Sequence, residues 1–212
     1  MSWPGRRGNS RTGRRAGDSG TRDAILSASR AQFAEHGYDG ATIRAIARAA
    51  GVDPALVHHY YGDKENLFAA AMQLPVIPSE VIAAALTRRN PGESLGTHMV
   101  ATALSVWESA EVRDAFLTML RSALTSDQAA ATLREFITQA ILRPLASAAE
   151  GGVAERAPFR ASLVGTQMLG LALSRYVLRF EPVASASADE LAAAVGPTID
   201  RYLTGEIEAG KP

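Results

Sequence analysis

The segment from Thr42 to Lys64, TIRAIARAAGVDPALVHHYYGDK, decides the fold. It contains two short helical patterns, one that stops at Gly51 and one that starts where Asp53 precedes Pro54. A helix of fewer than about ten residues is unstable alone and must pack on a neighbour. The segment therefore predicts two short helices that cross each other and pack on a third, the arrangement of a helix-turn-helix.

Four residues of this segment specify how the two helices cross. Ala47 leaves room for a close approach, and Gly51, four positions later, can adopt the turn conformation that a Cβ disfavours. Val52 and Val57 are placed to pack inward. A small residue, a glycine and two apolar residues at these offsets indicate a helix-turn-helix far more specifically than any single residue does.

The outer face of the second short helix is the predicted functional surface. The major groove of DNA admits a helix whose N-terminal half meets base edges, where His, Tyr and small apolar side chains can donate, accept or pack on thymine methyl groups. Helix N-termini favour phosphate, so Thr42 and Lys64 are predicted backbone clamps, and Arg44 is a third. With Val57 turned inward, helical spacing gives the outer face Ala55, His58 and His59, flanked by Leu56 and Tyr60.

Plainer explanations exist for several of these side chains. Adjacent residues on a helix point about 100° apart, whereas chelation within a helix favours spacings of about three or four, so His58 and His59 predict no metal site. Tyr60 and Tyr61 could both be core aromatics, and Lys64 could be only a solvated charge.

Composition excludes several classes of protein. The chain has no cysteine, which excludes disulfides, thiolate metal sites and a cysteine nucleophile. The first 20 residues contain five arginines and lack the apolar stretch of a secretory signal. The longest charge-free stretch of the C-terminal half, between Arg160 and Arg175, is shorter than the roughly 20 residues that a membrane span needs. We therefore expect a cytoplasmic protein.

The formal charge is zero overall but unevenly distributed. Residues 1–65 contain ten basic and seven acidic residues, and the remainder contains twelve and fifteen, which gives +3 and −3. A basic N-terminal third suits a polyanion, although charge alone decides nothing.

The chain as a whole is predicted to be all-α and to have three parts. Residues 1–20 are rich in Gly, Arg and Ser and are expected to form a disordered basic tail, 21–66 the helix-turn-helix domain, and 67–212 a larger helical domain. Kinks or splits are expected at Pro144 and Pro197. The predicted helices are 21–35, 42–50, 54–61, 63–72, 79–89, 94–109, 112–125, 127–149, 157–180 and 188–204.

The span from Thr21 to about Phe68 resembles the DNA-binding domain of the tetracycline-repressor (TetR) family. The resemblance rests on AQFAEHGYDGATIRAIARAAGV, then a short recognition helix, a tyrosine-rich end and DKENLF. It implies a dimeric regulator, usually a repressor, with two recognition helices on a near-palindromic operator and a helical domain that accepts a small-molecule effector. Leu56 and His58 depart from the family, which often has threonine and tyrosine there. By position, the resemblance implies a DNA-facing set of Thr42, Arg44, Pro54, Ala55, Leu56, His58, His59, Tyr60 and Lys64.

Nothing after Pro78 carries a catalytic signature. No nucleophile elbow, phosphate-binding glycine loop or metal-ligand pair occurs there, so we expect no enzyme and no cofactor besides the effector. Methionine and aromatic side chains suit a cavity for ligands of variable shape, with plain core packing as the alternative for each. The candidates for the ligand cavity are His98, Met99, Trp107, Phe116, Met119, Phe136 and Met168.

The last two long helices carry small and apolar residues that permit close helix contact. Two such helices from each of two subunits would form a four-helix interface, and the resemblance places the family's dimer interface there. A two-fold dimer sets the spacing of two DNA half-sites. The predicted interface residues are Val164, Gly165, Met168, Leu171, Ala193, Ile199 and Leu203.

Two other function classes remain open at this point. An all-α enzyme or small-molecule carrier would need convergent titratable groups in the helical body, and the sequence shows none. A DNA-architectural protein that binds no effector is the other class, but it would not need so large and apolar a helical body. The tail arginines are expected to add phosphate or minor-groove contacts. These are Arg6, Arg7, Arg11, Arg14 and Arg15.

Overall fold

The computed structural model describes residues 13–87, 92–147, 156–205 and 207, and within these ranges the regular structure is entirely helical. The first four helices are α1 (Gly13–Gly40), α2 (Ile43–Ala50), α3 (Pro54–Tyr61) and α4 (Lys64–Ala71). The body contains α5 (Pro78–Thr87), α6 (Leu95–Trp107), α7 (Ala110–Thr125), α8 (Asp127–Ile137), α9 (Arg143–Ser147), α10 (Ala157–Ala172) and α11 (Ala188–Leu203), with π-helical turns η1 (Thr138–Leu142) and η3 (Leu173–Val177). The all-α prediction, with a helix-turn-helix before a larger helical body, is confirmed.

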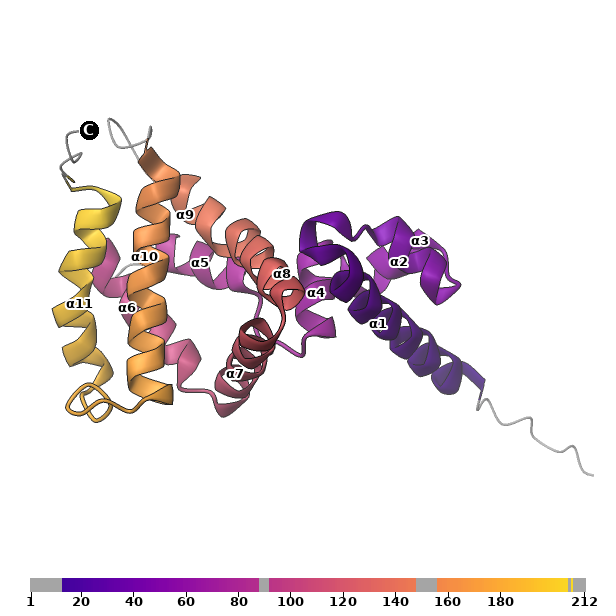
Figure 1. Ribbon diagram of the computed structural model, residues 1–212, viewed down its shortest axis with the longest axis horizontal. Coiled ribbons are helices and arrows are strands. Elements are labelled where there is room, and N and C mark those ends of the chain that lie inside the picture. Colours follow the sequence, from indigo (N-terminus) through magenta and orange to yellow (C-terminus); the bar gives the residue numbers. More distant parts are fainter. Residues whose placement is uncertain (1–12, 88–91, 148–155, 206, 208–212) are drawn as a thin grey trace, which may run out of the picture.

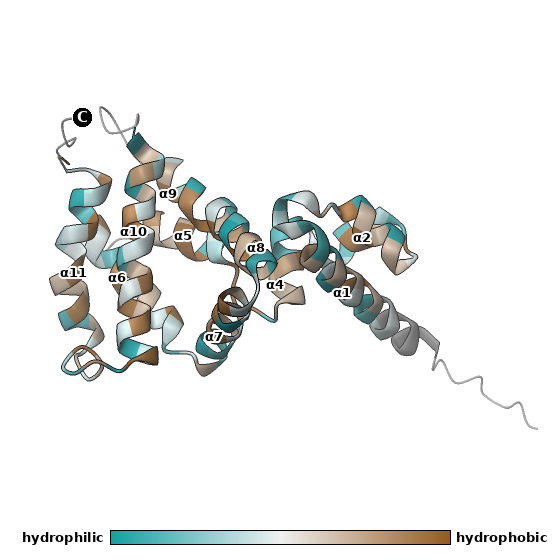
Figure 2. Ribbon diagram, viewed as in Figure 1, coloured by the Kyte–Doolittle hydropathy of each residue, from teal (hydrophilic) through white to brown (hydrophobic). Residues whose placement is uncertain are grey.

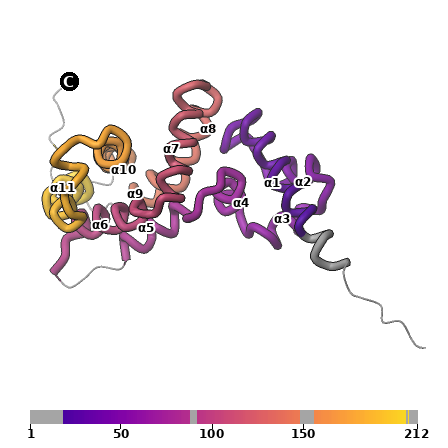
Figure 3. The backbone as a smooth tube through the Cα atoms, turned by 90° about the horizontal axis from the view of Figure 1, so that it is seen from below, coloured from indigo at the N-terminus to yellow at the C-terminus, as the bar shows by residue number. Residues whose placement is uncertain are grey.

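The helices form an elongated arrangement with two cores. Both views place α1, α2 and α3 at one end of the molecule and α10 and α11 at the other (Figures 1 and 3). One apolar cluster joins α1 to α4 with part of α8 and η1, and the other joins α5, α6, α9, α10 and α11. None of the described helices combines the length and the apolar character that crossing a bilayer requires.

The short helices have the capping residues that the sequence indicates. The side chains of Thr42, Asp53 and Asp63 accept hydrogen bonds from the N–H groups of Ala45, Ala55 and Asn66, at 3.1, 2.8 and 2.8 Å. After α2, Gly51 has a φ of 69°, the left-handed turn that favours glycine. These local interactions fix where α2, α3 and α4 begin and where α2 ends.

Helix α1 is longer than the sequence predicts. It begins at Gly13 instead of Thr21, and it runs to Gly40 with a break at Gly37, where φ is 73° and ψ is 179°. The predicted tail is thus helical over residues 13–20, whereas 1–12 lie outside the described residues. The composition of residues 13–20 suggests disorder, but these residues continue a helix that buried Ile25 and Phe33 already anchor. Adding a residue to an existing helix gains a hydrogen bond without the cost of a new nucleus.

The two internal prolines have different effects. The predicted helix 127–149 is interrupted by η1, which ends at Leu142, two residues before Pro144. A π turn widens the backbone ahead of the proline ring, which would otherwise clash with the carbonyl four residues earlier. The expected split at Pro197 is wrong, because α11 is continuous from Ala188 to Leu203 and contains this proline on its exposed side.

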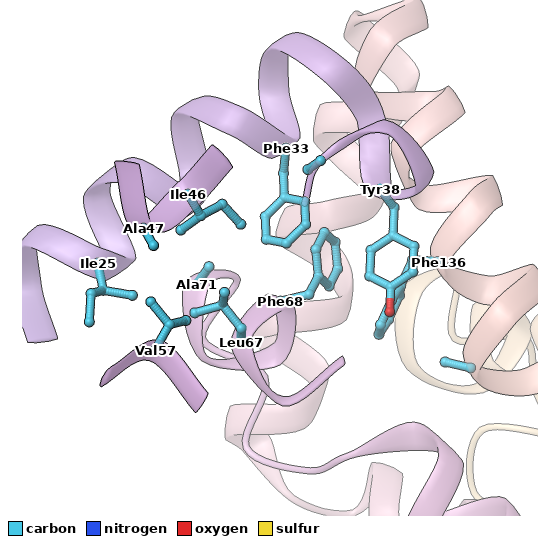
Figure 4. Packing of buried hydrophobic residues seen from close by; sticks show 12 residues of the cluster. Ile25, Phe33, Tyr38, Ile46, Ala47, Val57, Leu67, Phe68, Ala71 and Phe136 are labelled. Carbon is cyan, nitrogen blue, oxygen red and sulfur yellow. The ribbon is translucent and has the colours of Figure 1, made fainter. Parts of the chain in front are cut away.

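An aromatic cluster joins the helix-turn-helix to the body. Phe136 of α8 inserts among α1 and α4 side chains, with its ring centroid 4.3 Å from that of Phe68 and 5.3 Å from that of Tyr38 (Figure 4). Phe33 packs edge-on against Phe68 at 4.9 Å. Leu67 and Phe68 of α4 both belong to this cluster, and the predicted domain boundary between residues 66 and 67 falls inside α4.

Polar contacts fasten the same junction. The N–H of Asp39 donates to Glu135 Oε2 at 2.8 Å, and Gln139 Nε2 donates to the Asp39 carboxylate at 3.2 Å. The Thr132 hydroxyl donates to the Phe33 carbonyl at 3.3 Å. Helix α8 and the end of α1 are therefore held together by aromatic packing and by directed hydrogen bonds.

Two glycines let α6 and α11 touch backbone to backbone. A Cβ at Gly96 would lie 2.1 Å from the Gly196 carbonyl oxygen, and a Cβ at Gly196 would lie 2.6 Å from the Cα of Thr97. The Gly96 N–H donates to Asp200 Oδ1 at 2.7 Å across the same contact. No other residue type fits at this crossing without moving a helix.

We expect Gly96→Ala to lower the free energy of unfolding by about 1–3 kcal/mol, because the added methyl group forces α6 away from α11. Gly20→Ala is the matched control: it lies in α1 with open space around it, and the change should raise stability by roughly 0.5–1 kcal/mol. Thermal and urea unfolding followed by circular dichroism measure both. A Gly96→Ala protein as stable as the wild type would contradict the contact.

Candidate nucleic-acid interface

The orientation of α3 follows from one buried side chain. Val57 is 1% exposed and packs in the first cluster near Ile25 and Leu67 (Figure 4). On the opposite side of the helix, Ala55, His58 and His59 are exposed. The positions of Val57 and of the histidine pair therefore agree with the sequence prediction. Pro54, Leu56 and Tyr60 are half-buried at the sides of this exposed face.

Helix α2 adds hydroxyl and cationic groups. Thr42 and Arg44 are exposed, and the Thr42 oxygen that accepts from Ala45 keeps its own proton for donation. Arg48 is exposed one helical turn after Arg44. Sequence reasoning did not name Arg48, although the four-residue spacing from Arg44 would have placed both guanidinium groups on one side of α2.

The two tyrosines at the end of α3 are partly structural. Tyr60 and Tyr61 are half-buried and pack against the first cluster. The Arg22 guanidinium lies 4.8 Å from the Tyr60 ring centroid, and the Tyr61 hydroxyl donates to the Arg22 carbonyl at 3.5 Å. Burial raises the pKa of Tyr61 above its usual value, against the lowering effect of Arg22. Arg22, which sequence reasoning did not single out, thus brings a cation from α1 to α3.

Lys64 has an intramolecular role that the sequence did not predict. Its Nζ donates to the Asp39 carbonyl at 3.2 Å and lies 4.8 Å from the Tyr38 ring centroid. Burial lowers the pKa of Lys64, while Asp39 and Glu135 act in the opposite direction. Two of its three N–H donors remain for other partners. Lys64 is therefore part of the junction between the helix-turn-helix and α8.

The structure does not bring the seven predicted ligand-cavity residues together. Phe136 is wrong as a cavity residue, because it fills the junction cluster, and Met99 is buried in the second core. Their apolar character reflects core packing. The others are half-buried at separate places: His98 contacts Glu93, Trp107 contacts Tyr176, Met168 packs on the second core, and Phe116 and Met119 lie on α7.

An apolar hollow occurs elsewhere in the body. It has a volume of about 440 Å³ and contains none of the seven predicted residues. The segment from Leu74 to Ile77, which connects α4 to α5, forms one side of it, and Ala84, Thr102 and Val106 form another. No sequence pattern predicts this position, because the hollow depends on how α5 and α6 pack. Among the residues that the structure describes, no three His, Asp or Glu side chains gather as a metal site.

Four of the seven predicted dimer residues point into their own chain. Val164, Leu171, Ile199 and Leu203 are buried in the second core and are unavailable to a partner. Of the rest, Ala193 is exposed, and Gly165 and Met168 are half-buried.

The exposed side of these two helices carries other residues. Phe159 and Leu169 of α10 are 48% and 42% exposed, and Pro197 lies on the exposed side of α11. Figure 2 shows apolar residues along both helices. Each helix has apolar residues on two faces, and periodicity alone does not tell which face packs inside the chain, on α6 for α11 and on α9, η1 and α11 for α10.

Two family models match the chain in adjacent ranges. The model of the bacterial regulatory proteins of the tetR family matches residues 25–71, which include α2, α3 and α4. The model of the tetracyclin repressor-like C-terminal domain matches residues 93–203, more than half of the 212 residues.

Two transcriptional regulators are similar to part of the chain. The transcriptional repressor AcnR of Corynebacterium glutamicum is 51% identical over 57 residues, 26% of this chain and 30% of AcnR. The transcriptional regulator BetI of Rhizobium meliloti is 36% identical over 74 residues, 34% of this chain and 36% of BetI. The chain thus aligns with only about a third of these relatives' own length.

One solved structure is similar over nearly the whole chain. The crystal structure of a TetR-family regulator from Streptomyces coelicolor A3 is 42% identical, covers 90% of this chain and 98% of its own, and has a TM-score of 0.51. With one family model on the helix-turn-helix and another on most of the body, the chain belongs to the TetR family of bacterial regulatory proteins.

Proposed function

We propose that the protein is a non-enzymatic transcriptional repressor that binds a near-palindromic DNA operator as a homodimer and leaves it when a small molecule binds the helical body. The observation that carries the proposal is the exposed face of α3, with Val57 buried behind it and arginines on α2 beside it. An exposed helix face of this kind fits the major groove.

The exposed groups divide into two kinds of DNA contact. Ala55 and His59 lie opposite Val57 and near the middle of the face, where they meet base edges. The remaining groups contact phosphates. Such contacts fix the register and orientation of the protein on DNA but carry no sequence information. This role suits three exposed residues at the start of and along α2: Thr42, Arg44 and Arg48. Lys64 adds the two N–H donors that are not bonded to the Asp39 carbonyl oxygen.

The homodimer forms through the exposed sides of α10 and α11. The inner side of α11 packs on α6, and that of α10 packs on α9, η1 and α11, which leaves Phe159, Leu169 and Ala193 free to meet a second copy. Two helices from each chain would form a four-helix interface. This interface lies at the far end of the body from α3, so a small rotation between subunits changes the separation of the two recognition helices (Figure 1).

Effector binding reaches the DNA-binding helices through the junction with α8. Glu135, Phe136 and Asp39 couple α8 to the end of α1, so a shift of α8 carries the helix-turn-helix with it. The hollow beside Leu74 and Val106 suits an apolar ligand, and it adjoins the segment that follows α4. A ligand that prefers the body conformation with separated recognition helices by about 1–3 kcal/mol weakens DNA binding roughly 5- to 150-fold.

Selection of bound sequences from random duplex DNA is the direct test of function, and we expect it to recover a near-palindrome. On that operator, Arg48→Ala should weaken binding and lower the slope of log affinity against log salt by about one per chain. His59→Ala should instead relax base preference at one position of each half-site. The control is Arg121→Ala, an exposed arginine of α7. Failure to enrich any sequence, or equal loss in the Arg121 variant, would contradict the interface.

A second prediction concerns the assembly. We expect the wild type to sediment as a dimer at micromolar concentration and Leu169→Arg to sediment as a monomer, because a charge at the centre of the apolar face cannot be desolvated there. Leu124→Arg is the matched control, since Leu124 is 77% exposed on α7 and lies outside the proposed interface. A wild-type monomer, or a Leu169→Arg dimer of full stability, would refute this interface.

A further inference from the structure

His58 is held in one orientation by the end of its own helix. Its Nδ1 lies 2.7 Å from the carbonyl oxygen of Gly62, and the Gly62 N–H donates to the His58 carbonyl at 2.8 Å. The two residues therefore bond each other twice across the last turn of α3, where Gly62 has a φ of 76°. The ring stays exposed, with its Nε2 edge free to meet a ligand.

This geometry fixes where the imidazole proton sits. A carbonyl oxygen only accepts hydrogen bonds, so Nδ1 must be the donor, and the neutral ring then carries a lone pair at Nε2. A phosphate oxygen of DNA also only accepts. Neutral His58 consequently has no hydrogen left for a phosphate, whereas the imidazolium form has one at Nε2.

On the basis of the proposed DNA-binding function, we propose that His58 binds a DNA phosphate as an imidazolium, so that each chain takes up one proton at Nε2 when it binds DNA. His58 lies at the edge of the exposed face, about 100° from Val57, whereas Ala55 and His59 lie near its middle. The Gly62 contact also draws the His58 ring toward the C-terminal end of α3, which favours a phosphate over a base edge as its partner. The carbonyl groups at a helix C-terminus also favour a cation.

The charged groups of the surrounding elements leave His58 without a competing partner. Asp53 and Asp63 cap the starts of α3 and α4, and Lys64 bonds Asp39. Over the described ranges, no carboxylate forms an ion pair with His58. The other charged side chains on the neighbouring elements include Arg22, Asp23, Arg30 and Glu35 of α1, Arg44 and Arg48 of α2, and Glu65 of α4.

His59 supplies the matched comparison on the same face. Its ring contacts Tyr60, with the centroids 5.4 Å apart, and within the described residues it has no hydrogen bond that selects a tautomer. Neutral His59 can therefore present a donor from either nitrogen without gaining a proton. Of the two histidines, only His58 must be protonated before it can donate a hydrogen bond to a phosphate.

The test is the pH dependence of binding to a long mixed-sequence DNA duplex at fixed salt, between about pH 5.5 and 8.5, the range in which histidine titrates. One proton taken up per chain raises affinity as the pH falls, by up to about tenfold per chain for each pH unit. We expect the wild type and His59→Gln to show this rise. His58→Gln should lose most of it, and His58→Lys, which is charged throughout the range, should bind tightly with a flat profile.

Folding and function are separated by two further measurements. Circular dichroism melts at each pH identify a variant that fails to fold, and imidazole ¹⁵N shifts of the DNA-free protein above pH 8 should report the Nδ1–H tautomer of His58. An Nε2–H tautomer, or an unchanged pH profile in folded His58→Gln, would overturn the proposal while leaving DNA binding intact. A wild type that binds no duplex at any pH would instead refute the proposed function.

Discussion

The burial of Val57 is the interaction on which the functional surface depends. Helix α3 is too short to be stable alone, and Val57 is its one fully buried side chain, packed among residues of α1, α2 and α4. Because neighbouring positions on a helix are separated by about 100°, this single contact fixes the direction of every other α3 side chain. The left-handed turn at Gly51 then sets the angle at which α3 leaves α2.

The same core includes residues of α8 and η1, so the helix-turn-helix and this part of the body pack as one unit. Phe136 completes the aromatic cluster around Phe68, and Glu135 holds the backbone just after the break in α1. A Cβ at Gly37 would lie 2.7 Å from a Glu135 oxygen, so the positive φ of Gly37 and the lack of a side chain both serve this contact. The body therefore contacts the helix-turn-helix domain through α1 as well as through α4.

The predictable parts of the molecule are those that local sequence determines. Caps such as Asp53 and the turn at Gly51 depend on residues a few positions away, and they identified α2, α3 and the exposed histidines. The dimer candidates on α10 could not be sorted in advance because Val164 and Leu169 lie on different sides of this apolar helix, and only its packing on α9, η1 and α11 decides which side is buried. Phe136 was misplaced for the same reason, since its aromatic partners are about 70 and 100 positions away in the sequence.

The most direct test of the account is amide hydrogen exchange of the whole chain with and without the selected operator duplex. If the exposed face of α3 binds DNA, new protection will be concentrated in α2, in α3 and at the start of α4. Protection that falls mainly on the body, with α3 unchanged, would show that the surface opposite Val57 is not the DNA-binding surface.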